Sequence, residues 1–199
     1  MTGLMSVNGE AGGDPLRVGL PVVDMVTGMN GVIGMLLALQ ERQRSGLGQL
    51  VDVSLYDSGI SLLHPHAGNW FMSGRTPGRS GNAHPNIYPY DSFATGTTPV
   101  FLAVGNDRQF RLLCEHLGCP QLVADERFAT AGQRSHHRDA LKPLLEQALQ
   151  ASDGPALADA LMAIGVPAAP VLGVDAALNH PHTLHREMVV EMEGGYRAV

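Results

Sequence analysis

Asp24 is the first residue whose type and setting could do chemistry, because a single carboxylate stands there between two apolar runs. It falls where an extended segment, residues 16–23, gives way to a long apolar helix predicted for residues 25–44. An aspartate is ionised at neutral pH, which is the form that a carboxylate nucleophile needs. The same place suits the N-cap of the helix, a role that contributes about 1 kcal/mol. Spacing alone favours the cap, and the two roles are compatible.

A second candidate is the loop of residues 81–90, which mixes amide and imidazole side chains with glycine and proline. Such a loop can present N–H groups and polar side chains to a ligand. The substrate-binding candidates in it are Gly81, Asn82, His84, Asn86 and Tyr88. An ordinary connection between two domains has the same composition, and the pattern alone slightly favours that interpretation.

The histidines and cysteines do not have the spacing of a metal site. His64 and His66 stand two residues apart on a predicted helix, so they do not share a face, whereas a metal needs convergent ligands. Cys114 and Cys119 are interpreted as small buried hydrophobes. No dinucleotide fingerprint, P-loop, nucleophile elbow or zinc-protease motif is present. We therefore expect no bound metal.

The elements that position Asp24 alternate between extended and helical patterns, which predicts an α/β fold class. They are a strand with a turn in residues 1–17, the long helix in 25–44, a strand in 49–54 and a second helix in 55–72. Glycines recur every third residue in the long helix, and we expect another backbone to pack closely there. The apolar run approaches membrane-spanning length, but Asp24 lies within it, which predicts a buried core helix instead.

A Gly/Pro/Ser-rich stretch, residues 73–81, marks a boundary, and the pattern changes after it. The later elements predicted are a hairpin (88–94 and 99–104), helices near 108–117, 134–149 and 155–164, an extended return (165–171), a helical turn (180–187) and a strand (188–192). Asn106 and Asp107 are placed to cap the first of these helices. The predicted organisation is a partial large domain (1–73), a linker (74–81), a small domain (82–171) and a return segment (172–199).

The composition of the chain indicates which binding partners and which cellular compartment to expect. The 199 residues carry a net charge of −6 and lack a basic cluster, so nucleic acid and anionic membrane are not expected partners. Two cysteines fit a reducing compartment better than a disulfide scaffold. The first residues have no basic segment followed by a long apolar core, so no secretory signal is expected. We predict a cytoplasmic protein.

Several motifs in order along the chain resemble those of the family III CoA-transferases. The motifs are residues 3–10 (GLMSVNGE), 18–24 (VGLPVVD), 46–55 (GLGQLVDVSL), 81–85 (GNAHP), 104–110 (VGNDRQF) and 165–171 (GVPAAPV). The resemblance implies a Rossmann-like large domain followed by a smaller α+β domain, in interlocked dimers. It also implies coenzyme A as a co-substrate, and an acyl-CoA and a small carboxylic acid as partners.

In that family the aspartate before the long glycine-bearing helix is the catalytic residue, and the matching position is Asp24. The resemblance implies that this carboxylate attacks an acyl-CoA thioester and forms a mixed anhydride. The CoA thiolate then gives an aspartyl-CoA thioester, from which CoA passes to the acceptor acid. A glycine-rich loop closes over the site in family members, and residues 81–88 match its place. Here the loop carries His84, Pro85 and Asn86 instead of a run of glycines.

Family members are roughly twice as long as this chain. The resemblance therefore implies a fragment without the N-terminal half that supplies most CoA contacts and without the C-terminal end. We expect the chain alone to be weakly active or inactive. Two other interpretations stay open: a 2-methylacyl-CoA racemase, which would use an Asp and a His as an acid/base pair, and a remnant or subunit that works only with a partner chain. The acyl donor and the acceptor are not identified by the sequence.

Overall fold

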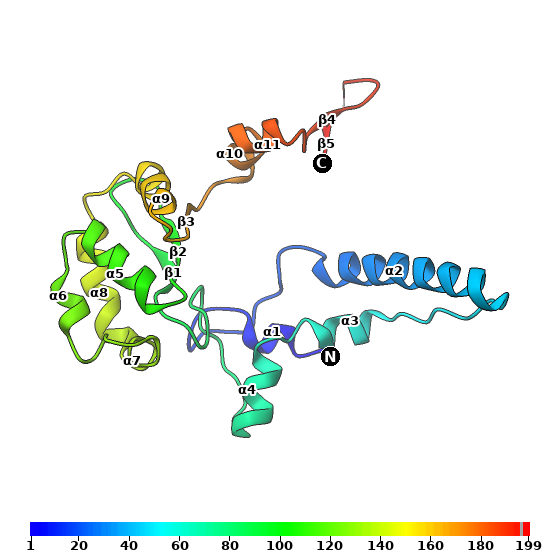
Figure 1. The fold of residues 1–199 in the computed structure, drawn as a ribbon, viewed down its shortest axis with the longest axis horizontal. Coiled ribbons are helices and arrows are strands. Elements are labelled where there is room, and N and C mark those ends of the chain that lie inside the picture. The colour runs from blue at the N-terminus through cyan, green and yellow to red at the C-terminus, as the bar shows by residue number, and fades with distance from the viewer. Residues whose placement is uncertain (196) are drawn as a thin grey trace. The chain divides into compact units, whose positions relative to one another are not determined.

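A computed structural model describes residues 1–195 and 197–199 of the chain (Figure 1). The chain separates into two units, Met1–Pro85 and Asn86–Val199. The first contains Asp24 and four helices: α1 (Leu4–Val7), α2 (Val22–Ser45), α3 (Leu55–Ser61) and α4 (His66–Ser73). The second contains every strand that the structure describes. Mixed α/β composition is thus confirmed, while a Rossmann-like large domain stays a prediction.

Helix α2 confirms the predicted long helix and begins three residues earlier, at Val22. Pro21 is the N-cap residue, and the first intrahelical bond runs from the Met25 amide to the Pro21 carbonyl, 3.1 Å apart. The helix ends at Gly46, whose φ of 73° is left-handed and whose N–H donates to the Arg42 carbonyl. The helix therefore ends in a glycine C-cap.

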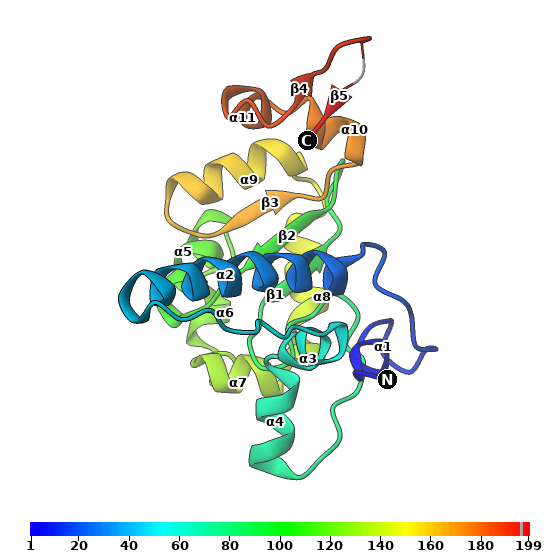
Figure 2. The same cartoon turned by 90° about the vertical axis from the view of Figure 1, so that its right-hand side faces the viewer.

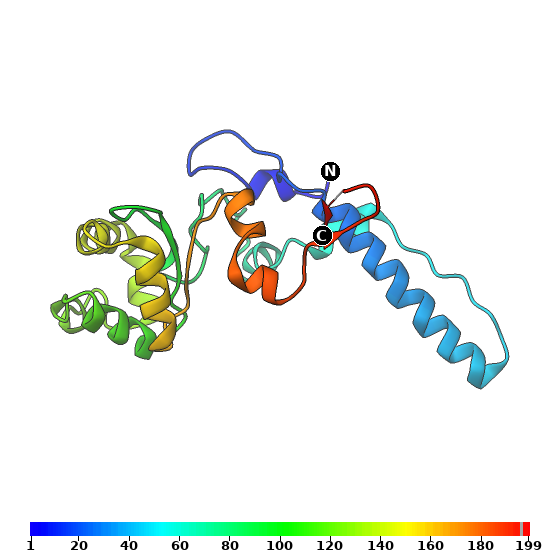
Figure 3. The same ribbon diagram turned by 90° about the horizontal axis from the view of Figure 1, so that it is seen from above.

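The prediction that α2 is a buried core helix is wrong for this structure, since no residue of α2 is buried. The chain after α2 returns alongside it (Figures 1 and 3), and this segment covers only one strip of the helix. A Cβ at Gly34 would lie 2.6 Å from Cγ1 of Val51. The glycine therefore makes room for the Val51 side chain, whereas the sequence predicted close packing of another backbone. By length and composition alone α2 could cross a membrane. One such helix is weak support for that role, and the absence of a membrane partner stays a prediction.

Three other expectations for the first unit are wrong. Residues 4–7 form α1 where a strand was expected, and residues 49–54 are extended along α2 without a strand partner among the described residues. An extended pattern becomes a strand only when another strand satisfies its N–H and C=O groups. The single helix predicted for residues 55–72 is divided into α3 and α4. Pro65 stands at the N-cap of α4, where a residue without an N–H is tolerated.

The second unit is built on an antiparallel sheet in the order β1 (Tyr90–Phe93), β2 (Val100–Ala103), β3 (Ala168–Pro170). The predicted hairpin is confirmed, with Phe93 opposite Val100. Its helices are α5 (Asp107–His116), α6 (Gln121–Ala124), α7 (Ala131–His136), α8 (Arg138–Leu149) and α9 (Gly154–Ala163). Figure 2 shows α9 alongside β3, the strand that follows it. The remaining elements are α10 (Val174–Leu178), α11 (Pro181–His185), β4 (Val190–Glu191) and β5 (Arg197–Ala198).

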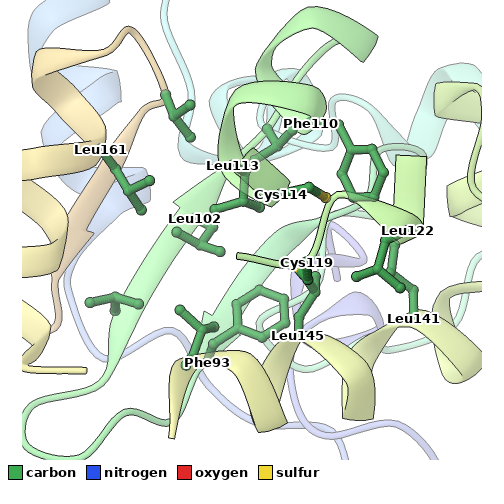
Figure 4. Close-up of a cluster of buried hydrophobic side chains, with 14 of the residues drawn as sticks. Phe93, Leu102, Phe110, Leu113, Cys114, Cys119, Leu122, Leu141, Leu145 and Leu161 are labelled. Atoms are coloured by element: carbon green, nitrogen blue, oxygen red, sulfur yellow. The ribbon is translucent and has the colours of Figure 1, made fainter. Parts of the chain in front are cut away.

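A closed hydrophobic core fills the space between this sheet and its helices (Figure 4). Leu141, Leu145 and Leu149 recur every fourth residue on α8 and are fully buried, as a helix with one apolar face requires. The predicted cap of α5 is confirmed, because Asn106 Oδ1 accepts from the Gln109 amide at 2.9 Å. The region predicted as one helix in 134–149 contains two, α7 and α8, which meet at His137.

The two cysteines are buried in this core, which confirms the expectation that they pack as small hydrophobes. They end α5 in a Schellman motif, in which the Cys119 amide donates to the Cys114 carbonyl at 2.9 Å. The Gly118 amide donates to the Glu115 carbonyl, and its φ of 68° is the left-handed value that this motif needs. The hydrogen bond that the Cys114 thiol makes with the Cys119 side chain, together with burial, raises the pKa of the Cys114 thiol.

A buried arginine ties the start of the second unit to its helices. Arg134 is fully buried, and its guanidinium donates to the Tyr88 carbonyl at 3.3 Å, the Phe128 carbonyl at 3.0 Å and Asp107 Oδ1 at 2.8 Å. It also lies over the ring of Phe110, 4.4 Å from the centroid. Because a buried charge is tolerated only when it is paired and hydrogen-bonded, these contacts account for its burial.

Candidate functional site

Asp24 is the third residue of α2 and its carboxylate is exposed. The helix has no side-chain cap, so the interpretation of Asp24 as the N-cap is wrong: Pro21 holds that place. Among the described residues, the Asp24 side chain makes no hydrogen bond or ion pair. The first amides of a helix have no intrahelical acceptor, and together they form the positive end of its dipole. The carboxylate is therefore unpaired, and it lies next to the positive end of the helix dipole, which favours a negative charge.

The carboxylate lines a pocket of about 630 Å³ within the first unit. That size falls within the range of ligand sites, about 300–1,000 Å³. Its walls come from the first six residues and from the segment that leads into α2. The lining residues are Met1, Thr2, Gly3, Leu4, Met5, Ser6, Pro15, Arg17, Val18, Leu20, Pro21, Val22, Val23 and Asp24. Most are apolar, and only Arg17 and Asp24 among these side chains carry a charge.

Hydrogen bonds fix the segment that forms this wall. The Leu16 amide donates to the Asn8 carbonyl, and Nδ2 of Asn8 donates back to the Leu16 carbonyl, both at 2.9 Å. These paired bonds close the turn of residues 9–15 and hold the backbone next to Arg17. Within the turn, the Gly13 amide donates to the Glu10 carbonyl at 3.0 Å. The part of the wall next to Arg17 is therefore held by a hydrogen-bonded turn.

The same turn holds the beginning of the candidate loop. The Gly81 amide donates to the Gly9 carbonyl at 3.0 Å, so the loop and the turn below the pocket are joined. Gly81 has a φ of 61°, and a Cβ there would lie 2.9 Å from Oε2 of Glu10. Gly9 has a φ of 129°, and a Cβ there would lie 2.7 Å from the Asp14 carbonyl. Both positions need glycine for this contact to form.

The other loop candidates are divided between the units. Asn82 is exposed, in a turn closed by the Ala83 amide on the Ser80 carbonyl at 3.1 Å, and His84 is half-buried. Asn86 is exposed and Tyr88 is buried, and both belong to the second unit. The structure joins Gly81 to the turn below the Asp24 pocket. A substrate-binding role for all five residues stays a prediction.

Tyr88 lies in the core of the second unit, with its ring centroid 6.2 Å from that of Phe93. Its hydroxyl has no hydrogen-bond partner among the described residues. Burial and the negative charges of Asp91 and Glu146 raise the pKa of this phenol. The side chain therefore has a packing role in this structure.

No cluster of three or more potential metal ligands occurs among residues 1–195 and 197–199. His66 lines a separate apolar pocket of about 330 Å³ with Trp70 and Phe71, and burial lowers its pKa. The prediction of no metal is neither supported nor opposed by these facts.

One charged residue of the Asp24 pocket, Arg17, was not predicted from the sequence to be a site residue. Arg17 is an exposed arginine at the start of the apolar run that leads into α2. A lone cation in such a run is the signal that could have identified it.

Comparison with known proteins gives consistent matches over nearly the whole chain. The profile of CoA-transferase family III matches residues 1–199. The acetyl-CoA:oxalate CoA-transferase of Acetobacter aceti is 36% identical over 195 residues, which are 98% of this chain and 50% of that protein. The succinate–glutarate CoA-transferase of Agrobacterium fabrum is 37% identical over 193 residues, which are 97% of this chain and 48% of that protein.

A solved structure of a CaiB/BaiF family protein from Brucella suis has the same fold. It superposes with a TM-score of 0.77 at 38% identity, over 97% of this chain and 51% of that one. The chain thus spans about half the length of the relatives that it matches.

Proposed function

Because the chain belongs to CoA-transferase family III, we propose that it contributes the nucleophile of an enzyme that moves CoA from an acyl-CoA thioester to a carboxylic acid. The observation that carries this proposal is Asp24, an exposed carboxylate without a partner among the described residues, in a pocket at the start of a 24-residue helix. Coenzyme A is a substrate in this scheme, and no metal takes part.

The proposed reaction begins when an oxygen of the Asp24 carboxylate attacks the carbonyl carbon of the donor thioester. The C–S bond breaks, which leaves a mixed anhydride on Asp24 and free CoA thiolate. The thiolate attacks the aspartyl carbonyl, which releases the donor acid as a carboxylate and leaves an aspartyl-CoA thioester. Covalent catalysis of this kind divides one difficult exchange into easier steps.

The acceptor carboxylate then attacks the aspartyl-CoA thioester and forms a second mixed anhydride, and the thiolate leaves again. It attacks the carbonyl of the acceptor acid, and the new acyl-CoA and free Asp24 result. Each step passes through a tetrahedral oxyanion. The amides of residues 22–24 have no intrahelical acceptor, and the helix dipole adds positive potential at the same place. These donors would stabilise the developing charge.

The relatives favour transfer over racemisation, since the two named above are both CoA-transferases. They also name the acids: oxalate in one case, succinate and glutarate in the other. We propose accordingly that the acceptor or donor acid here is a small dicarboxylic acid. The resemblance further supports a homodimer, and the acidic composition supports a cytoplasmic enzyme that binds neither nucleic acid nor membrane.

The test is to trap the aspartyl intermediate. The chain is incubated with succinyl-CoA and hydroxylamine, which converts an aspartyl anhydride or thioester into a stable hydroxamate, and peptide mass spectrometry locates the label. We expect the label on Asp24, and its loss in Asp24→Asn while Asp52→Asn, an exposed carboxylate on the segment beside α2, retains it. We expect a small labelled fraction, because the chain covers half of its relatives. A label on another residue, or turnover that Asp24→Asn retains in any assembled enzyme, would refute the nucleophile.

A further inference from the structure

The pocket that contains Asp24 holds a second charged side chain to which no role has been given. Arg17 lines the pocket and is exposed. It makes no hydrogen bond or ion pair with any residue that the structure describes. In particular, no ion pair joins it to Asp24, although both side chains border the same space. The lining of the pocket therefore includes one basic and one acidic residue, and their side chains are not paired with each other.

The other arginine near this wall is Arg79, which makes one long hydrogen bond and has a buried Nε without a partner among the described residues. Nη1 of Arg79 donates to the Ser6 carbonyl at 3.4 Å, and its Cδ packs against Gly9. Arg79 does not line the pocket, whereas Ser6 does. Among the described lining residues, Arg17 is thus the only side chain that can offer a positive charge to a ligand.

A positive charge is needed there for a physical reason. Asp24 is itself an anion, so a second anion that enters the pocket is repelled unless a cation offsets the two negative charges. A monocarboxylic acid presents its one carboxylate to the reaction. A dicarboxylic acid brings a second carboxylate, which stays charged through every step and must be placed away from Asp24. The guanidinium group suits that carboxylate, because its planar fork matches the two oxygens.

We propose that Arg17 binds the non-reacting carboxylate of a dicarboxylic acid whose other carboxyl group reacts at Asp24. This inference rests on the proposed function and adds a residue that determines the class of acid accepted. The paired hydrogen bonds between Asn8 and Leu16 hold the backbone beside Arg17, so that Arg17 belongs to a fixed part of the wall. Arg17 selects for two carboxylates, and Asp24 performs the exchange.

The experiment measures binding, so that it does not depend on turnover. Isothermal titration calorimetry compares glutarate with pentanoate, which has the same number of carbons and one carboxylate. The proteins are the native chain, Arg17→Gln, Arg17→Lys and the control Arg44→Gln, an exposed arginine in the last turn of α2. We expect Arg17→Gln to weaken glutarate binding about tenfold, as loss of a charge-assisted pair does. Pentanoate binding should not change, Arg17→Lys should be intermediate, and Arg44→Gln should match the native chain.

The inference is overturned if the native chain does not bind glutarate, does not prefer it to pentanoate, or binds it equally well with Arg17→Gln. Equal losses for both acids would also overturn it, because they indicate general damage to the pocket. The proposed function is judged separately by Asp24→Asn. This variant should bind glutarate at least as well as the native chain, since one negative charge is removed, and should form no hydroxamate. If Arg17→Gln forms the hydroxamate normally and binds glutarate with unchanged affinity, the role of Asp24 as nucleophile is supported and the proposed role of Arg17 is refuted.

Discussion

Helix α8 in the second unit and helix α2 in the first are both apolar enough to form a core, yet only one of them does so. The buried leucines of α8 meet the sheet and the neighbouring helices. In α2 the corresponding side chains are exposed, and Leu36 and Leu37 have about 60% of their surface open to solvent. A pattern of apolar residues therefore identifies an element that can be buried but not what covers it.

The two units also differ in what they contribute: the second contains the hydrophobic core, and the first contains the candidate functional site. In the second unit, eighteen of the described hydrophobic residues are buried in one cluster, and burial of this kind is the main favourable contribution to folding. The first unit carries Asp24, the proposed nucleophile, and its pocket on elements with few buried residues. The predictions that follow test whether this contrast holds in solution, in order of decreasing effect.

The largest effect is expected from the same substitution made on both helices. Leu145→Ala removes a fully buried side chain from the core, and we expect it to lower the free energy of unfolding by about 2–5 kcal/mol. Leu36→Ala removes an exposed side chain, and we expect a change within about 0.5 kcal/mol. Urea unfolding gives the values, and amide hydrogen exchange of the intact chain shows which unit each substitution affects.

A loss at Leu36 as large as that at Leu145 would contradict the contrast. It would mean that α2 is covered in solution. Repeating the measurement over a hundredfold range of protein concentration distinguishes cover by a second copy, because the stability of an associated chain depends on concentration.

Much of the second unit could be predicted from local signals. The hairpin, α5 with its Asn106 cap and α9 each follow from a turn, a capping residue or a helical period within a few residues. In the first unit such local signals are not sufficient to predict the structure. Residues 49–54 have the alternation of a strand, but a strand needs a partner, and the described residues provide none. The exposure of α2 likewise depends on packing between distant residues.

The candidate site was predicted in part. Asp24 is identified by motif order, yet its place in the first turn and not at the cap depends on Pro21, which starts the helix earlier than its apolar period suggests. Arg17 and Arg134 could not be assigned from the sequence. An arginine is usually exposed, so neither a place in a pocket wall nor full burial follows from residue type.

The second prediction concerns that buried arginine. Arg134→Met keeps the length of the side chain but leaves the Tyr88 and Phe128 carbonyls without their donor. We expect a loss of about 1–3 kcal/mol in the free energy of unfolding, because buried acceptors lose a partner. The matched control is Arg127→Met, whose guanidinium forms an exposed pair with Asp125 at 2.7 Å. Exposed pairs contribute little, so this control should unfold like the native chain. Equal losses in both variants would show that Arg134 is not buried in solution.

The smallest effect is expected at Tyr88, and it depends on pH. Burial raises the pKa of the phenol above its ordinary value near 10. The folded state therefore favours the neutral form, and the unfolded chain loses its proton first as the pH rises. The contribution of Tyr88 to stability is fully present below pH 10 and is lost above it, by at most about 1.4 kcal/mol per pH unit. Tyr88→Phe removes this dependence while it keeps the ring beside Phe93.

The measurement is urea unfolding of the native chain and Tyr88→Phe between pH 7 and pH 11. At pH 7 the two should differ little, because the hydroxyl removed has no hydrogen-bond partner among the described residues. Above pH 10 the native chain should become the less stable of the two. All other titratable groups are common to both proteins, so the difference isolates Tyr88. If the free energy of unfolding of the two proteins depends on pH in the same way up to pH 11, the Tyr88 phenol is exposed to solvent. The core of the second unit would then be accessible at Tyr88, the residue at which the candidate loop reaches it.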